Sequence, residues 1–438
     1  MFSHRFTLYC FTLVFVWSNA GAENRIDTQR PDAPELAAYG AFDVGVQTLN
    51  VSNPQQIDIL QLDPSKDEPS NLPRYERPLT LEVWYPAIKG STGKTTLDAY
   101  IRDGKTQVEL HGKAVRDAKP AHSAQAYPLV LISHGYPGNR YLLANLAENV
   151  ASKGFVVVSI DHTDSTYRSK AAFASTLVNR PVDQIFVLDK VAQMSTDSSS
   201  FLHGLVDTNN SALIGYSMGG YGAVINAGAG LTEQAVNSRL GSPFGTLARH
   251  QTGQKPAVDS RLKTVIAFAP WGMNYAMWNA ETLQEVSIPM LLIAGSQDDV
   301  SGYENGVRAI WQGISNVDRS LLTYDNANHS AGAVMPAPQE SYVFSQELGF
   351  NVSEHYIDAV WDNTRMNNIA QHFVTVWLNK YLKHDANMNR YLELVPSSND
   401  GVWAMDEAGK GKAEHSYWPG FAKRTAKGLH FESLIKGQ

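Results

Sequence analysis

The chain has 438 residues, enough to bury a large core as one domain with insertions or as two ordinary domains. Apolar residues make up 43% of the sequence and charged residues 18%, which excludes a disordered or fibrous protein. The net charge of −7, without a clustered Lys/Arg run, argues against a nucleic-acid partner and suits neutral or apolar small substrates.

Residues 1–22 are typical of a cleavable signal peptide. A positive start precedes an apolar run at residues 6–17, and small residues at 20–22 suit cleavage before Glu23. The apolar run is shorter than the ~20 residues that a membrane span needs, so we expect no stable membrane anchor. We therefore expect a secreted or periplasmic protein. The only cysteine, Cys10, lies in this segment, which excludes cysteine catalysis and thiolate metal sites from the mature chain.

The first part of the mature chain is predicted to hold two strands with polar segments around them. The strands are expected at residues 42–51 and 79–85, with a polar loop at 62–77 between them. Residues 88–126 are charged and rich in turn-forming residues, and we predict that they form a surface excursion.

From residue 127 onward, apolar strands alternate with helices. The predicted strands are residues 129–132, 155–160, 211–214, 264–269, 289–294 and 320–324, and the predicted helices are 141–152, 182–194, 220–227 and 367–383. Such an alternation predicts an α/β fold, with a mostly parallel central sheet and helices on both of its faces.

The predicted catalytic domain spans residues 23–384 and contains two long connections, near residues 165–180 and 231–261. We expect these insertions to act as a lid or to shape a pocket above the sheet. Residues 385–438 carry several aromatic side chains, so we expect this C-terminal extension to pack on the domain.

The segment Gly215-Tyr216-Ser217-Met218-Gly219 places a serine between a predicted strand and a predicted helix. A serine on such a sharp turn is exposed to substrate, and the glycines let the backbone segments approach closely. The helix N-terminus also directs its amides at the hydroxyl. The motif therefore predicts that Ser217 is a nucleophile, provided that a base and an acid follow.

A serine hydroxyl needs an imidazole to take its proton and a carboxylate to orient that imidazole, here in the chain order serine, acid, histidine. Asp298 follows a predicted strand and is the candidate acid, with the adjacent Asp299 as an alternative. His329 lies in the loop after the next strand and is the candidate base. His355 and His372 fall on later helix-like segments and fit this role less well.

Hydrolysis also needs backbone donors for the oxyanion of the tetrahedral intermediate. We expect one to be the N–H of Met218 and the other the N–H of Tyr136, in the turn after the strand at 129–132. Pro137 has no N–H to offer. The side chains of Tyr136 and Trp271 are expected to flank the cleft and bind substrate, although Trp271 fits equally well in a core.

His134, His162, Asp161 and Asp164 gather at predicted strand ends, as metal ligands often do. Their spacing matches no metal motif such as His-Glu-x-x-His, and the chain has no glycine-rich phosphate loop. We therefore expect neither a metal site nor a cofactor.

Taken together, these motifs resemble those of the α/β-hydrolase superfamily. They are residues 133–138 (SHGYPG), 154–158 (GFVVV), 215–220 (GYSMGG), 295–298 (GSQD) and 328–330 (NHS). Within the superfamily the chain is similar to predicted dienelactone hydrolases, to the platelet-activating-factor acetylhydrolase group and to cutinase-like polyester hydrolases. In the last group an Ala-Pro-Trp segment places a tryptophan on the substrate, and residues 269–271 match it.

The chain departs from each of these groups. Platelet-activating-factor acetylhydrolases carry their acid after the sixth strand, where this chain has Ala269-Pro270, so Asp298 is the better acid. Dienelactone hydrolases use a cysteine where this chain has Ser217. Compact cutinase-like enzymes lack the two insertions and the C-terminal extension, so we expect a more covered cleft that favours small or flexible acyl chains.

The sequence thus predicts an exported serine carboxylesterase that acts through an acyl-enzyme on short-to-medium acyl esters, extending to aliphatic polyesters such as polylactide. The alternatives are a lipase-like phospholipid esterase related to platelet-activating-factor acetylhydrolases, and a serine peptidase or amidase. A third alternative is a binding protein that keeps a hydrolase scaffold without catalysis. The expected partner is a small or polymeric ester, and the sequence does not determine the oligomeric state.

Overall fold

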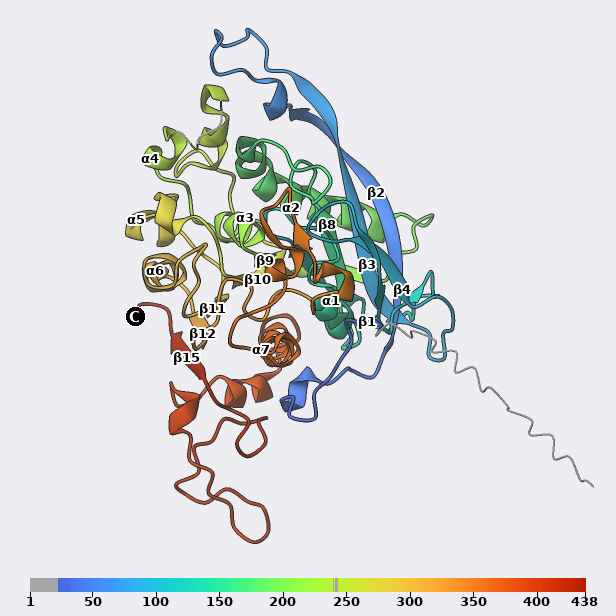
Figure 1. Ribbon diagram of the computed structural model, residues 1–438, viewed down its shortest axis with the longest axis vertical. Helices are drawn as coiled ribbons and strands as arrows, with labels where there is room; N and C mark the ends of the chain where they lie inside the picture. The colour runs from blue at the N-terminus through green and yellow to red at the C-terminus, as the bar shows by residue number, and fades with distance from the viewer. Residues whose placement is uncertain (1–22, 239, 241–242) are drawn as a thin grey trace, which may run out of the picture.

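A sheet of ten strands runs through the middle of the computed structural model, which describes residues 23–238, 240 and 243–438 (Figure 1). Its strands are β2 (Asp43–Ile57), β3 (Arg74–Ala87), β6 (Val115–Arg116), β7 (Tyr127–Ser133), β8 (Val156–Asp161), β9 (Val206–Tyr216), β10 (Leu262–Phe268), β11 (Met290–Gly295), β12 (Arg319–Tyr324) and β15 (Leu429–Leu434). Their order is β15-β12-β11-β10-β9-β7-β8-β3-β2-β6. The strands from β12 to β8 are parallel, and β15 and the β2–β3 pair continue the sheet in antiparallel fashion. The predicted α/β fold is confirmed.

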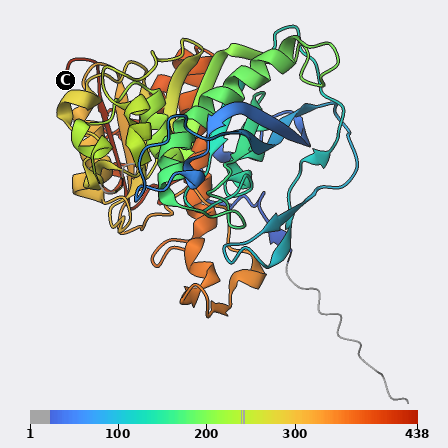
Figure 2. The same cartoon turned by 90° about the horizontal axis from the view of Figure 1, so that it is seen from above.

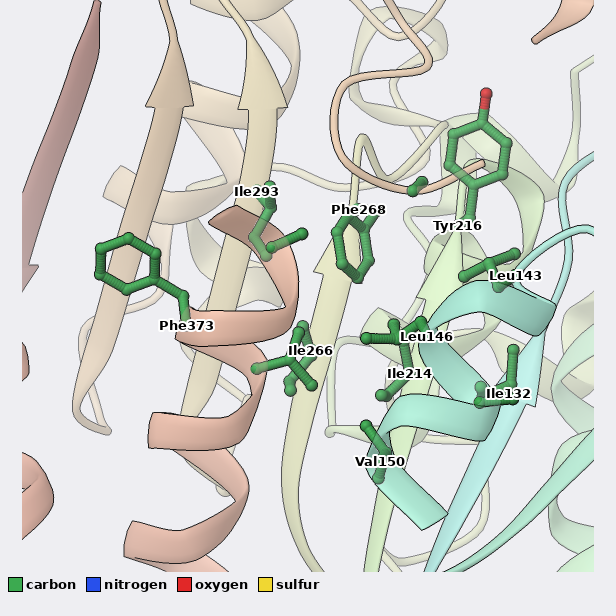
Figure 3. Packing of buried hydrophobic residues seen from close by; sticks show 14 of the residues in the cluster. Ile132, Leu143, Leu146, Val150, Ile214, Tyr216, Ile266, Phe268, Ile293 and Phe373 are labelled. Atoms are coloured by element: carbon green, nitrogen blue, oxygen red, sulfur yellow. The ribbon is translucent and has the colours of Figure 1, made fainter. Parts of the chain in front are cut away.

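Helices cover both faces of the sheet because its parallel strands are apolar on both sides. Along β7, Val130 and Ile132 belong to one core cluster and Leu129 and Leu131 to the other, as the two-residue period of a strand requires. The helices α1 (Ala144–Ala151) and α7 (Asn363–Leu382) cover the first face. The second face carries α2 (Phe173–Thr196), α3 (Met218–Asn226), α5 (Ala280–Leu283) and α6 (Ala309–Gly313). Figure 3 shows α1 and α7 packed on the first face.

The segment at residues 88–126 is more regular than we predicted. It contains β4 (Thr96–Tyr100) and β5 (Gln107–His111), which form a separate three-stranded sheet with β1 (Asn24–Arg25). Alternate residues of β4 and β5 are buried, and Leu97 and Leu110 join the core cluster under α1. These strands are too short for their alternation to stand out among the surrounding charged residues.

Helix α2 begins about nine residues before the predicted start at residue 182, so the second half of the predicted insertion at 165–180 belongs to this crossover helix. Pro181 lies inside α2. Because a proline usually marks the beginning or the interruption of a helix, the sequence pattern predicted a start just after it.

The C-terminal segment extends the central sheet. β15 pairs antiparallel with β12, and the rings of Phe431 in β15 and Phe373 in α7 stack with their centroids 5.1 Å apart. Trp418 and Phe421 are buried in the same core cluster. Figures 1 and 2 show the C terminus on one side of the molecule and β4 on the other.

The predicted signal peptide, with Cys10, lies outside the described residues. Among the residues that are described, none of the helices combines the length and apolarity that a membrane span requires.

Candidate active site

Ser217 lies at the sharp turn between β9 and α3, with φ 53° and ψ −113°. A non-glycine residue in such a conformation costs about 1–3 kcal/mol, so the surroundings must hold it. The Ser217 N–H donates to the Phe268 carbonyl over 2.9 Å, and the Ser217 carbonyl accepts from the amides of Tyr221 (2.9 Å) and Trp271 (3.2 Å). The turn is therefore fixed to α3 and to the end of β10.

Gly215 and Gly219 have no room for a side chain, because neighbouring backbone atoms lie too close. A Cβ on Gly215 would lie 2.2 Å from the Gly219 carbonyl oxygen, and a Cβ on Gly219 would lie 1.9 Å from the Ser133 carbonyl oxygen. Both distances are far below van der Waals contact, and the atoms they meet are backbone. Only glycine lets the end of β7 approach the first turn of α3 this closely.

His329 and Asp298 lie on the loops after β12 and β11 and are in contact. The His329 Nδ1 is 3.0 Å from both carboxylate oxygens of Asp298. The Asp298 Oδ1 also accepts from the backbone amides of Val300 (3.0 Å) and Ser301 (2.8 Å). Burial acts to raise the pKa of Asp298, but these hydrogen bonds and the adjacent imidazole outweigh burial and lower the pKa below its usual value.

Asp298, rather than Asp299, meets the histidine because the loop after β11 is held in one conformation. The Ser301 hydroxyl donates to the Ala269 carbonyl (2.8 Å), and the Gln297 amide donates to the Ala327 carbonyl (2.9 Å). The Asp298 side chain is thereby buried, whereas Asp299 is exposed.

A cavity of about 590 Å³ contains both Ser217 and His329. Its lining comprises Arg102, Tyr136, Pro137, Tyr216, Ser217, Asp299, Val300, Asn328, His329, Ser330, Phe350, Glu354, His355, Ile357 and Ala359. Residues 350–359 come from the segment between β12 and α7, of which the sequence analysis named only His355, as a less suitable base. Their place at the site depends on tertiary folding, and no local pattern marks them.

The other two candidate histidines, His355 and His372, form hydrogen bonds with groups other than Ser217. The His355 Nε2 lies 2.8 Å from the Tyr167 hydroxyl, and burial, together with the charges of Arg102 and His329, lowers the pKa of His355 to about 3. The Nδ1 of the buried His372 accepts from the Leu36 amide at 3.2 Å.

Tyr136 lines the cavity, and among the described residues no hydrogen bond uses the N–H of Tyr136 or the N–H of Met218. These are the two amides predicted to bind the oxyanion. Trp271 is outside the cavity lining. Its ring stacks on Tyr275 (4.5 Å) and meets the edge of Phe173 (5.2 Å), so a contact between Trp271 and substrate stays a prediction.

The two predicted insertions differ in their relation to the cavity. In the first, Tyr167 binds His355 and the Phe173 ring contacts Tyr136 (5.0 Å), so this segment supports the cavity walls. In the second insertion, residues 243–250 contact α2, and residues from 249–259 line a different cavity of about 430 Å³ that does not include Ser217. A role of residues 231–261 as a lid over Ser217 stays a prediction.

A second set of serine, histidine and aspartate, fully buried, is joined by hydrogen bonds near the site. The Ser133 Oγ is 2.8 Å from His162 Nε2, and His162 Nδ1 is 3.0 Å from Asp183. The Arg77 guanidinium donates to both carboxylate oxygens of Asp183, at 2.8 and 3.0 Å, so both oxygens act as acceptors. His162 therefore donates from Nδ1 and accepts the Ser133 hydroxyl at Nε2. The Gln184 Nε2 joins this array to α3 by donating to Ser133 (2.9 Å) and to the Gly219 carbonyl (3.0 Å).

This buried array explains the residues that suggested a metal site. Burial, followed by the Arg180 charge, lowers the pKa of both His134 and His162 well below the usual value, so both stay neutral. Asp161 binds Arg140 and Asp164 binds Arg77. In the described part of the chain no three metal-ligating side chains gather.

Comparison with known proteins agrees with this fold. A family model described as PET hydrolase-like matches residues 111–240, which include Ser217. Cutinase est1 of Thermobifida alba is 29% identical over 206 residues, 47% of this chain and 54% of the relative. Cutinase cut1 of Thermobifida fusca is 24% identical over 64% of each chain. A bis(hydroxyethyl) terephthalate hydrolase of Streptomyces coelicolor is 24% identical over 46% of this chain and 49% of the relative.

A solved structure titled as a ferulic acid esterase from Streptomyces cinnamoneus shares the fold, with a TM-score of 0.51 and 20% identity over 81% of this chain and 94% of that one. The chain therefore has the α/β-hydrolase fold. Its similarity to cutinases and to the PET hydrolase-like model agrees with the expected resemblance to cutinase-like polyester hydrolases. The chain spans about half the length of the first curated relatives it matches.

The buried array predicts a large loss of stability for Asp183→Ala. The substitution leaves Arg77, whose side chain is 1% exposed, without its main partner. Removing one member of a buried ion pair costs about 3–5 kcal/mol, which urea unfolding would measure. Asp189→Ala is the matched control, because Asp189 lies on the same helix but its side chain is 60% exposed. The control should lose less than about 1 kcal/mol. Equal losses in the two variants would contradict the assigned role of the array.

Proposed function

We propose that this protein is a serine carboxylesterase. The observation that carries the proposal is that Ser217, on its strained turn, shares one cavity with His329, whose Nδ1 contacts Asp298. The unused N–H groups of Tyr136 and Met218, on two neighbouring strand-to-helix turns, add to this support.

In the proposed mechanism the Ser217 Oγ attacks the ester carbonyl carbon while His329 takes the hydroxyl proton. Asp298 orients the imidazole and stabilises its cationic form. The Tyr136 and Met218 amides donate to the oxyanion. His329 returns the proton to the departing alcohol, and a water then cleaves the acyl-enzyme by the same steps to release the acid.

The substrates we propose are short-to-medium acyl esters, extending to aliphatic polyesters such as polylactide. The printed names of the relatives include cutinases and a bis(hydroxyethyl) terephthalate hydrolase, which supports ester chemistry for this chain. Residues from 350–359 line the same cavity as Ser217, and we expect this added wall to favour a small or flexible acyl chain over a rigid polymer surface.

Replacing the nucleophile tests the proposal directly. Ser217→Ala should lower kcat for p-nitrophenyl butyrate on the order of 10⁶-fold, because the covalent step is lost, and should end labelling by a fluorophosphonate probe. Circular dichroism should show an unchanged fold. Ser199→Ala, at an exposed serine, is the control and should retain full activity. A folded Ser217→Ala variant with near-normal rate would exclude this mechanism.

A pair of aspartate variants distinguishes the two neighbouring carboxylates. Asp298→Asn should lower kcat about 10⁴-fold, because the amide no longer holds the imidazole in its working tautomer. Asp299→Asn removes the same charge one residue away and should change kcat by less than about tenfold, since Asp299 has no contact with His329 among the described hydrogen bonds. If the larger loss fell on Asp299→Asn, Asp299 would be the acid.

We also propose that the protein is exported to the periplasm or the medium. The support is the sequence of residues 1–22, with its short apolar run and small residues before Glu23. The expected result is an exported chain that begins at Glu23, measured by intact-mass spectrometry. A chain that stays in the cytoplasm with residues 1–22 attached would contradict export.

A further inference from the structure

Arg102 brings a permanent positive charge to the cavity that contains Ser217. It follows β4, in the turn that joins β4 to β5, and its side chain is half-buried. Among the residues that line the cavity it is the only lysine or arginine. The two lining histidines differ from it: His329 is assigned to proton transfer, and His355 stays neutral because its pKa is lowered to about 3 by burial first and by Arg102 second.

The guanidinium of Arg102 has no acceptor within the described chain. None of the hydrogen bonds or ion pairs between described residues uses it, and the guanidinium carbon lies 5.6 Å from the centre of the Phe350 ring. The neighbouring Asp103 does not neutralise it. That carboxylate accepts from the amides of Lys105 and Thr106 (both 2.9 Å) and from the Thr106 hydroxyl (2.6 Å) in its own turn.

The turn that carries Arg102 is anchored to the active-site loops. The side-chain Nδ2 of Asn139 donates to the Tyr100 carbonyl at the end of β4 over 2.8 Å, and Asn139 follows the Tyr136 turn. A Cβ on Gly104 would lie 2.4 Å from the Tyr167 carbonyl oxygen, so the turn packs directly on the segment that binds His355. The backbone of Arg102 is therefore held in a fixed position relative to the cavity.

Two carboxylates also line the cavity, those of Glu354 and Asp299. Glu354 accepts from the backbone amide and the side-chain amide of Asn351, both at 3.0 Å. Asp299 is exposed, and its charge acts on Tyr216, beside His329. The cavity thus contains one guanidinium, that of Arg102, and the carboxylates of Glu354 and Asp299, neither of which forms an ion pair with Arg102 among the described residues.

A planar guanidinium with five unused donors suits a carboxylate better than any neutral group, because it can bind both oxygens at once. Resting on the proposed esterase function, we propose that Arg102 selects esters that carry a free carboxylate at the far end of the acyl chain, such as monoesters of aliphatic dicarboxylic acids. Hydrolysis of such a monoester consumes one water and releases the dicarboxylic acid, as its dianion, with the alcohol and one proton.

Monomethyl adipate and dimethyl adipate test this selectivity, because they share one acyl chain and differ by one negative charge. Arg102→Gln should lower the ratio of kcat/KM for the monomethyl ester to that for the dimethyl ester by about 10–100-fold, with the change mostly in KM. Arg102→Lys keeps the charge but loses the two-pronged geometry, and should fall between wild type and Arg102→Gln.

Arg168→Gln is the matched control. Arg168 is exposed, lies over the Tyr100 ring and does not line the cavity, so this variant changes the net charge equally and should leave the ratio unchanged. A direct binding measurement avoids turnover. Calorimetry should detect monomethyl adipate binding to Ser217→Ala, and adding Arg102→Gln to that variant should weaken the binding by a similar factor.

The possible failures are distinguishable. The assignment of Arg102 would be overturned if Arg102→Gln left the ratio of kcat/KM for the two adipate esters unchanged. It would also be overturned if that ratio fell equally in Arg102→Gln and Arg168→Gln. Either result would leave the esterase function intact. A wild-type protein that hydrolyses neither adipate ester nor p-nitrophenyl butyrate would instead overturn the proposed function.

Discussion

The close approach of β7 to the first turn of α3 is the constraint on which the rest of the site depends. The backbone at Ser133 leaves no room for a side chain at Gly219, and the carbonyl of Gly219 leaves none at Gly215. Because both contacts are so close, the backbone must turn sharply between β9 and α3. This turn forces Ser217 into its strained conformation. The same contact brings the two proposed oxyanion amides, from the ends of two adjacent strands, to one place.

The buried array below the turn maintains this contact. Gln184 binds Ser133 on β7 and Gly219 on α3, and the Ser133 hydroxyl is held in turn by His162 and Asp183. Among the described residues, a serine, a histidine and an aspartate thus come together at two places. The buried set is closed by Arg77 and has no route for substrate, whereas the set at Ser217 opens into a cavity. Environment, and not residue type, separates this structural array from the set proposed to be catalytic.

Segments distant in the sequence determine what can reach Ser217. The turn after β4 contributes Arg102, and the connection between β12 and α7 contributes Phe350 and His355. The Tyr167–His355 hydrogen bond joins this second segment to the loop before α2. These additions therefore contribute to the shape and the charge of the cavity.

Sequence alone determined the features that depend on local order. The apolar strands predicted the sheet and its fold, because the parallel strands are buried on both faces along most of their length. The glycines around Ser217, and the strand ends that carry Asp298 and His329, predicted which residues would be brought together. The helix that contains Pro181 was predicted too short, since a proline usually marks a helix start rather than its interior.

Only the tertiary structure placed Asp298, rather than Asp299, against His329, because the anchoring of Ser301 to Ala269 directs one carboxylate inward and leaves the other exposed. It also placed residues 243–250 against α2 and Arg102 in the cavity lining. These outcomes come from contacts between residues far apart in the chain. A local sequence pattern does not predict such contacts, because they form only after the sheet has brought the distant segments together.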